Sequence, residues 1–274
     1  MTTQSDNYFK PNGQISLNYK NTFGKHDVGV LALWEFYNDR TDWVKAYRQF
    51  TVGAIDQIGA GDKTNINNDG KASVSAHTGL VGRINYAFAS KYLAEFSFRY
   101  DGSYKFAPGK RWGFFPAGSL GWRISEEPFL KKYYWLSSLK LRASWGLTGN
   151  NDIANYSFMN KLSSANYSFG SGTGKVSSGL ANPTSVIANR DITWEQSSEY
   201  NYGLDLSLFD NRINFSGEYY YSETVQMLYQ QTALSITGFQ KFWNNIGKVA
   251  NKGFEFELRT MNIDKEKILL EIII

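Results

Sequence analysis

Side-chain character alternates with a period of two over most of this 274-residue chain. From Tyr200 to Phe209, Tyr and Leu occupy one parity while Asn, Gly, Asp and Ser occupy the other. The segment from Ile213 to Tyr221 repeats this alternation. Because successive side chains of a β-strand point to opposite faces of the sheet, a period of two predicts strands with one apolar and one polar face. The pattern therefore predicts an all-β fold.

A tight turn joins these two segments. Asp210 and Asn211 tolerate the positive φ that a two-residue hairpin turn requires. Such a turn places Phe209 opposite Arg212, so that the residue numbers of every opposed pair sum to 421. This register brings apolar residues together, as a buried or lipid-facing side requires. The predicted apolar pairs are Leu208 with Ile213, Leu206 with Phe215, Tyr202 with Tyr219 and Tyr200 with Tyr221.

The same alternation predicts nine strands in all, with a tenth expected in the tail. Short links (23–27, 89–91, 210–211 and a moderate one at 125–138) alternate with long links (38–78, 102–113, 150–191 and 223–245). In an antiparallel up-and-down meander the long links then share one end, which is the asymmetry of outer-membrane β-barrels. The expected strands are 14–22, 28–37, 80–88, 92–100, 114–124, 139–147, 200–209, 213–221 and 254–258.

Two classes of protein show this alternation, a transmembrane β-barrel and a soluble antiparallel sheet. Strands of about ten residues match a tilted strand that crosses a bilayer, whereas soluble strands centre nearer ~5–6 residues. Aromatic residues such as Tyr92 and Tyr100 stand at the ends of apolar faces, as membrane girdles require. No apolar run approaches the ~20 residues of a transmembrane helix. The pattern favours the barrel, and a soluble or surface β-sheet binding module without transport activity is the alternative.

The sequence offers no grouping for catalysis, a cofactor or a metal. The absence of Cys excludes disulfides, thiol nucleophiles and Cys-ligated zinc. His26 and His77 lie in different links, without a Ser-Asp grouping beside them. The glycine-rich run at 170–175 lacks the first Gly and the final Ser or Thr of a P-loop, and Ala76 replaces the bidentate Glu of a calcium loop beginning at Asn65. With 29 basic and 25 acidic residues interleaved, nucleic acid is not an expected partner.

Five motifs occur in a fixed order along the chain: FRYDGSYKFAPGKRWGFFP at 98–116, GWRISEEPFL at 121–130, LKLRASWGLTGN at 139–150, WE at 194–195 and NIGKVANKGFE at 245–255. In this order they resemble the barrel of SusC/RagA-type TonB-dependent outer-membrane transporters of Bacteroidetes. The resemblance extends over about residues 12–262. It implies a barrel of about 22 strands in the outer membrane, closed by an N-terminal plug. It also implies TonB as energy source and a SusD-like surface lipoprotein that helps to capture oligosaccharides or peptides.

The chain shows no signal peptide, plug or TonB box, and fewer than half of those strands. We therefore expect a gene fragment with Met1 as an internal start. Residues 1–12 are expected to be a polar N-terminal segment, 13–262 part of the barrel, and 263–274 an atypical tail, truncated or frameshifted. Because a portion of a large barrel keeps its curvature, we expect an open, curved antiparallel sheet whose neighbours follow chain order. Without a plug and an energy-coupling segment, no transport by this chain alone is expected.

Nutrient would meet the long links first. Aromatic rings suit the apolar faces of sugars, and packing of the links against one another is the competing explanation for each ring. The candidate substrate-contact residues are Trp43, Tyr47, Tyr156, Tyr167, Phe239 and Trp243.

Overall fold

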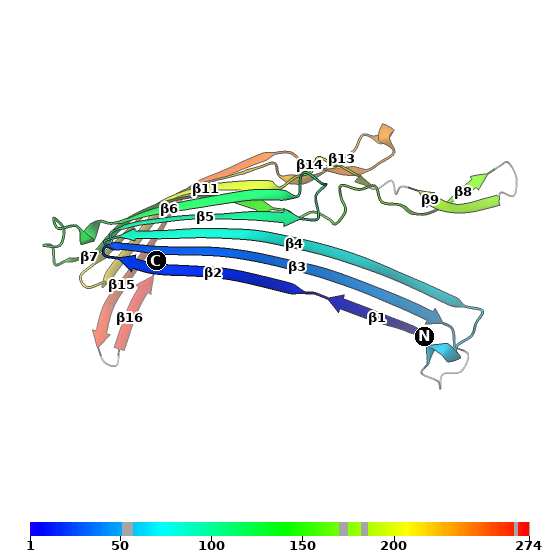
Figure 1. Cartoon of the computed structure of the whole chain (residues 1–274), viewed down its shortest axis with the longest axis horizontal. Coiled ribbons are helices and arrows are strands. Elements are labelled where there is room, and N and C mark those ends of the chain that lie inside the picture. The colour runs from blue at the N-terminus through cyan, green and yellow to red at the C-terminus, as the bar shows by residue number, and fades with distance from the viewer. Residues whose placement is uncertain (51–56, 170–174, 182–185, 266–267, 274) are drawn as a thin grey trace.

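A computed structural model describes residues 1–50, 57–169, 175–181, 186–265 and 268–273. One antiparallel sheet of eleven strands dominates it (Figure 1). In spatial order the strands are β1 (Thr2–Phe9), β3 (His26–Arg48), β4 (Ile66–Phe88), β5 (Tyr92–Ser103), β6 (Trp112–Arg123), β7 (Leu136–Asn150), β11 (Glu195–Leu208), β12 (Ile213–Val225), β15 (Lys248–Lys265) and β16 (Ile268–Ile273), and β2 (Asn12–Phe23) also pairs with β3.

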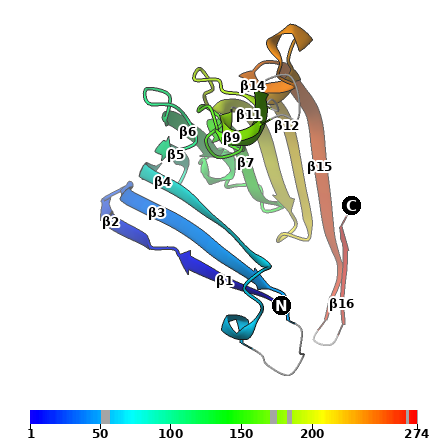
Figure 2. The same cartoon turned by 90° about the vertical axis from the view of Figure 1, so that its right-hand side faces the viewer.

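The sheet is long and curved, and its two outer sides remain apart (Figure 2). Among the described pairings, β1 and β2 bond only to β3, and β16 bonds only to β15. The expected open, curved sheet is therefore confirmed. Figure 1 shows short turns at one end, called here the turn end, and most of the longer links at the other, called here the loop end.

The predicted hairpin between β11 and β12 has the predicted register. Tyr202 lies opposite Tyr219, and Leu208 opposite Ile213. Asp210 and Asn211 both have positive φ, as does Phe209. The rule that apolar residues oppose each other across a tight turn was therefore sufficient to predict the register of this hairpin.

Part of the link predicted at 38–78 is instead strand. β3 continues to Arg48 and β4 begins at Ile66, so that each strand has 23 residues. These extensions carry polar residues on both faces, so the apolar alternation stops before the backbone ladder does. β1 pairs with the extension of β3, for example Asp6 with Trp43.

The links predicted at 150–191 and 223–245 also contain short strands. β8 (Ser163–Phe169) pairs with β9 (Lys175–Ala181). β14 (Lys241–Asn245) lies between β13 (Leu228–Thr232) and β10 (Val186–Ile187), and its pairing with β10 is parallel. The described helices are three single 3₁₀ turns, η1 (Ile58–Ala60), η2 (Ile124–Glu126) and η3 (Ser235–Thr237). None of the helices in these residues has the length and apolarity to cross a membrane.

The two faces of the sheet differ in chemistry. The apolar face carries residues such as Leu120 and Phe256, which are 65% and 68% exposed. The polar face carries charged residues such as Arg99 on β5 and Arg142 on β7, which pair with Phe115 and Gly121, the β6 residues of opposite parity to Leu120. A sandwich would cover the apolar face with a second sheet, whereas a barrel wall turns that face to lipid. The exposed apolar face is that of a barrel wall.

Candidate functional site

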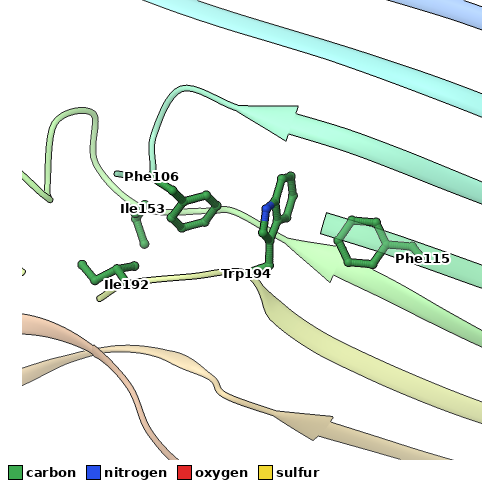
Figure 3. Packing of buried hydrophobic residues seen from close by; sticks show 5 residues of the cluster. All are labelled: Phe106, Phe115, Ile153, Ile192 and Trp194. Atoms are coloured by element: carbon green, nitrogen blue, oxygen red, sulfur yellow. The ribbon is translucent and has the colours of Figure 1, made fainter. Parts of the chain in front are cut away.

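A small buried core lies at the loop end (Figure 3). The Trp194 ring precedes β11, and its centroid is 5.3 Å from those of Phe106 and Phe115. Its indole N–H donates a hydrogen bond of 3.1 Å to the Arg111 carbonyl. The cluster members come from different links and strands, so their contacts hold separate links together. The full cluster is Phe106, Phe115, Ile153, Ile192 and Trp194, with Leu147, Leu228 and Trp243 packed against it.

Two side chains from the sequence motifs fasten the links around this core. The Glu195 carboxylate accepts hydrogen bonds from the Leu228 N–H (2.8 Å) and the Asn150 amide (3.2 Å). The Asn245 amide accepts from the Thr193 N–H (2.8 Å) and donates to the Thr193 carbonyl (2.9 Å). The motifs at 150, 194–195 and 245 therefore meet in space and hold the links.

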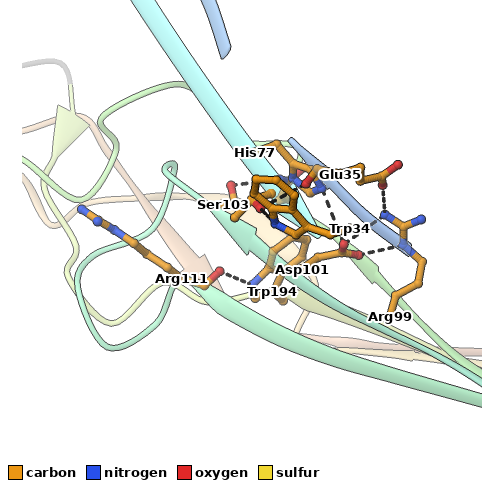
Figure 4. Close-up of polar contacts among 10 residues, drawn as sticks. Trp34, Glu35, His77, Arg99, Asp101, Ser103, Arg111 and Trp194 are labelled. Atoms are coloured by element: carbon orange, nitrogen blue, oxygen red, sulfur yellow. Dashed lines mark hydrogen bonds and ion pairs between the residues drawn. The ribbon is translucent and has the colours of Figure 1, made fainter. Parts of the chain in front are cut away.

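An ion network crosses three neighbouring strands on the polar face (Figure 4). The Arg99 guanidinium donates to both carboxylate oxygens of Asp101, at 3.0 Å each, and to Glu35 at 2.7 Å. The His77 Nε2 lies 3.6 Å from the same Asp101 carboxylate. Glu35, His77 and Asp101 are close enough to share a cation. Because Arg99 already bonds to both carboxylates, the group is an ion-pair network that joins β3, β4 and β5.

A polar cavity of about 310 Å³ adjoins this network. Register places the strand residues that line it on the polar face, since Tyr37 lies opposite His77 and His77 opposite Ser103. The links at 104–105 and 151–155 supply the other lining side chains. The principal lining residues are Tyr37, Asp39, Thr41, Ser73, Ser75 and His77 from the strands, with Tyr104, Lys105, Asn151 and Asn155 from the links.

The link side of this cavity is fixed by hydrogen bonds. The Lys105 ammonium donates to the Asn151 carbonyl (3.2 Å), and the Asn151 amide donates to the Ser103 hydroxyl (3.0 Å). The Tyr104 hydroxyl is buried and has no hydrogen-bond partner among the described residues. Burial raises the pKa of Tyr104 to about 12, and the nearby hydroxyl of Tyr156 adds to the effect. Tyr104 therefore keeps a neutral hydroxyl with a proton to donate.

The strand side of the cavity carries charge and one stacked ring. The Tyr37 ring stacks on His77 at a centroid distance of 5.6 Å. The Asp39 carboxylate accepts a hydrogen bond from Thr41 (3.3 Å) and pairs with Lys10 (3.1 Å). The cavity thus combines hydroxyls, a carboxylate and a ring, which can bind hydroxyl- or amide-bearing molecules.

The six aromatic residues predicted from sequence do not gather at one site. Trp43 and Tyr47 lie on β3 and not in a link, on the same parity as the cavity residue Thr41. Tyr156 lies beside the cavity, where its ring meets Tyr104 edge-on at 6.2 Å.

The other three lie elsewhere. Trp243, on β14, packs against the buried cluster, as the competing explanation of link packing expected. Phe239 lies between η3 and β14 and is half-buried. The backbone of Tyr167 lies in β8, and its side chain is outside the described residues.

Sequence reasoning missed the residues that build the cavity and network. Glu35 on β3 and Asp101 on β5 are far apart in the sequence. Only the pairing register shows that both lie opposite Gly79 of β4, one on each side of it. Extending the predicted pairing of β3 with β4 beyond Tyr37 would have placed Asp39 and Ser75 together. The available signal was therefore pairing register, because the apolar pattern had already ended.

Comparison with known proteins gives consistent matches. The family described as "TonB dependent receptor-like, beta-barrel" matches residues 1–264. TonB-dependent receptor P39 of Formosa agariphila is 37% identical over 272 residues, covering 96% of this chain and 24% of the receptor. TonB-dependent receptor SusC of Bacteroides thetaiotaomicron is 35% identical over 190 residues, covering 66% of this chain and 18% of SusC.

Solved structures match over nearly the whole chain. The RagAB peptide importer in its closed-closed state has a TM-score of 0.84 at 25% identity, covering 97% of this chain and 29% of the importer chain. The Escherichia coli outer-membrane transporter YddB, at 12% identity and a TM-score of 0.58, shows the fold alone. The chain spans about a quarter of the length of the curated receptors that match most of it.

Proposed function

Since the chain belongs to the TonB-dependent receptor β-barrel family, and within it resembles the SusC/RagA type, we propose that it forms part of the wall of an importer for oligomeric nutrients, either glycans or peptides. Members of this family are outer-membrane receptors and transporters of Gram-negative bacteria. The names SusC and RagAB among the matches support a SusD-like surface lipoprotein as partner and TonB as energy source.

The polar cavity is the observation that carries this proposal. A barrel turns its polar face to the lumen, so a cavity on that face near the long links lies where a nutrient would enter. Trp43 and Tyr47 extend along the same face of β3, beyond Thr41. We propose that the cavity holds one unit of the nutrient while these rings contact adjacent units.

A chimaeric receptor tests the proposal. Residues 1–264 of this chain would replace the matching quarter of a P39-like receptor, in cells that lack the native receptor. We expect insertion into the outer membrane and growth on the oligosaccharide or peptide that the recipient receptor imports. Asp39→Asn and Trp43→Ala should raise the half-saturation concentration for uptake, whereas Phe239→Ala, at a position that does not line the cavity, should leave it unchanged.

Two outcomes would contradict the proposal. An inserted chimaera in which the cavity substitutions leave uptake unchanged would remove the cavity from the nutrient path. A full chain that stays monodisperse and melts cooperatively without detergent would favour the soluble binding module, because its apolar face would then have to be covered.

A further inference from the structure

The link between β6 and β7 presents an aromatic and basic surface at the turn end. Tyr134 is 93% exposed and Phe129 is 58% exposed. Figure 1 shows this link projecting past the ends of the neighbouring strands at the turn end. We call Phe129, Lys131, Lys132, Tyr133, Tyr134 and Trp135 the turn-end patch; all six are exposed.

This link is anchored and not a loose loop. The Glu127 carboxylate accepts hydrogen bonds from the Tyr92 hydroxyl (2.7 Å), the Lys91 ammonium (3.0 Å) and the Trp122 indole (3.3 Å). The backbone N–H of Lys131 donates to the Glu127 carbonyl at 3.1 Å. The patch therefore has a fixed position relative to the first residue of β5 and the end of β6.

Its position coincides with the edge of the apolar face. Tyr92 and Trp122 lie on that face at the turn end, and their rings stack at 6.3 Å. Aromatic girdles of this kind mark the boundary between hydrocarbon and headgroups, and short turns face the periplasm. The turn-end patch, which follows Trp122 directly in the chain, then lies at headgroup level.

The charges of the patch favour an anionic partner. Lys131 pairs with Glu126 at 3.1 Å, and both side chains are about half exposed. The Lys132 ammonium lies 5.1 Å from the Tyr133 ring centroid and forms no ion pair among the described residues. Glu127 is already bonded to Lys91. Two lysines thus face one exposed carboxylate, among rings that can enter an interface.

We propose that the turn-end patch binds the headgroups of anionic phospholipids in the periplasmic leaflet. The rings insert at the boundary, while the lysine stems lie along it and their ammonium groups reach the phosphates. This inference rests on the membrane placement in the proposed function, but not on nutrient import.

The absence of Cys permits a site-specific test. An environment-sensitive fluorophore would be attached to Tyr134→Cys in the full chain, and in a control to Ile236→Cys, which replaces a 94% exposed residue at η3. We expect a larger blue shift at position 134 with vesicles containing phosphatidylglycerol than with pure phosphatidylcholine. The label at position 236 should respond equally to both. An equal blue shift at position 134 with both kinds of vesicle would overturn the headgroup proposal but not the membrane placement.

Charge substitutions give the quantitative test. Lys131→Gln with Lys132→Gln should weaken binding to phosphatidylglycerol vesicles about thirty-fold. This factor corresponds to the loss of about 1 kcal/mol of binding free energy for each lysine near an anionic surface. Lys45→Gln with Lys71→Gln, at exposed positions in β3 and β4, lowers the net charge from +4 by the same amount and should change binding little.

Equal losses from the two pairs would overturn the proposal, because they would reflect net charge and not this surface. A chain that bound neither vesicle would overturn the membrane placement as well. A response at position 134 that appeared only with periplasmic extract would assign the patch to a protein and overturn the lipid proposal.

Discussion

At the loop end, the links bury Phe106 and Ile192 completely, whereas at the turn end the link between β6 and β7 leaves Tyr134 93% exposed. The loop-end links meet in one core with hydrogen bonds at its rim (Figure 3). The turn-end link is anchored by the Glu127 carboxylate and by backbone hydrogen bonds, such as that from the Phe209 N–H to the Trp135 carbonyl, and it presents its rings outward. A core of its own lets the loop end hold a defined cavity, while the turn end leaves its rings available to lipid.

The two ends also differ in how the chain reverses direction. At the turn end, residues other than glycine adopt positive φ, among them Ala89, Ser90 and Phe209. At the loop end, Gly109, Gly238 and Gly247 hold several such positions, although Tyr156 and Gln226 do so as well. The turn end, where Gly24 is the glycine with positive φ among the described residues, therefore holds more residues with side chains in this conformation than the loop end does. Substitutions matched between the two ends can test this difference.

The largest effect is expected from Trp194→Ala. Loss of the ring removes its contacts with Phe106 and Phe115 and its hydrogen bond to Arg111. We expect the free energy of unfolding to fall by about 3–5 kcal/mol, as for other buried tryptophans. Trp135→Ala, at a 40% exposed turn-end position, should cost less than about 1 kcal/mol. Urea titration in lipid vesicles measures both, and equal costs would contradict the contrast between the ends.

Gly149→Ala should cost less. A Cβ at this position on β7 would overlap the Phe115 ring, which is buried in the cluster. Overpacking of this kind costs about 1–3 kcal/mol. Gly59→Ala, in η1 with open space around it, is the control and should change stability little. A neutral Gly149→Ala would show that Phe115 moves freely, and that the loop-end core is not tightly packed.

The fold was predictable from the sequence wherever one face had to be apolar. The pairing of Tyr202 with Tyr219 followed from alternation and a two-residue turn, since a shift by one residue would exchange the faces. Beyond Tyr37 both faces of β3 mix polar and apolar residues, so the pattern could not distinguish strand from link. The ladder continues there because backbone hydrogen bonds need no apolar side chain once register is set.

The loop-end site was predictable only in part. The motifs containing Asn150, Trp194 and Asn245 were recognised as a family signature, but their shared task of joining the links depends on three-dimensional proximity. Trp243 could not be distinguished as a core residue, because an aromatic residue in a long link suits ligand contact and packing equally. The cavity needed Asp39 and Tyr104, which lie on different elements and share no motif.

A pH-dependent effect is expected at the turn end from Glu127→Gln. The hydrogen bond from the Tyr92 hydroxyl, and then that from Lys91, holds the pKa of Glu127 below its usual range. A carboxyl with a lowered folded-state pKa contributes stability above its unfolded pKa, near 4.3, and loses it as pH falls through the folded value.

Wild type should therefore be more stable than Glu127→Gln at pH 7, and the difference should shrink as the pH falls below about 4. Tyr92→Phe, which removes the principal donor, should show a weaker dependence on pH than wild type. Urea midpoints at several pH values measure this. A difference between wild type and Glu127→Gln that stays constant from pH 7 to pH 3 would contradict an ionised anchor.

The smallest effect is expected from relieving one turn. Ser90 has a φ of 57° in the β4–β5 turn, which the Lys91 N–H closes on the Phe88 carbonyl at 2.9 Å. The left-handed conformation destabilises a residue with a side chain by roughly 1–2 kcal/mol. Glycine avoids this cost, but its greater freedom in the unfolded chain lowers the free energy of unfolding by about 0.5–1 kcal/mol. Ser90→Gly should therefore raise the free energy of unfolding by about 0.5 kcal/mol.

The reverse substitution is available in the neighbouring turn. Gly24 has a φ of 64° between β2 and β3, and a Cβ there would meet no atom within 4 Å. Gly24→Ala should lower stability by a similar amount, for backbone reasons alone. If both substitutions changed the urea midpoint in the same direction, backbone strain would not be what distinguishes the turn end from the loop end.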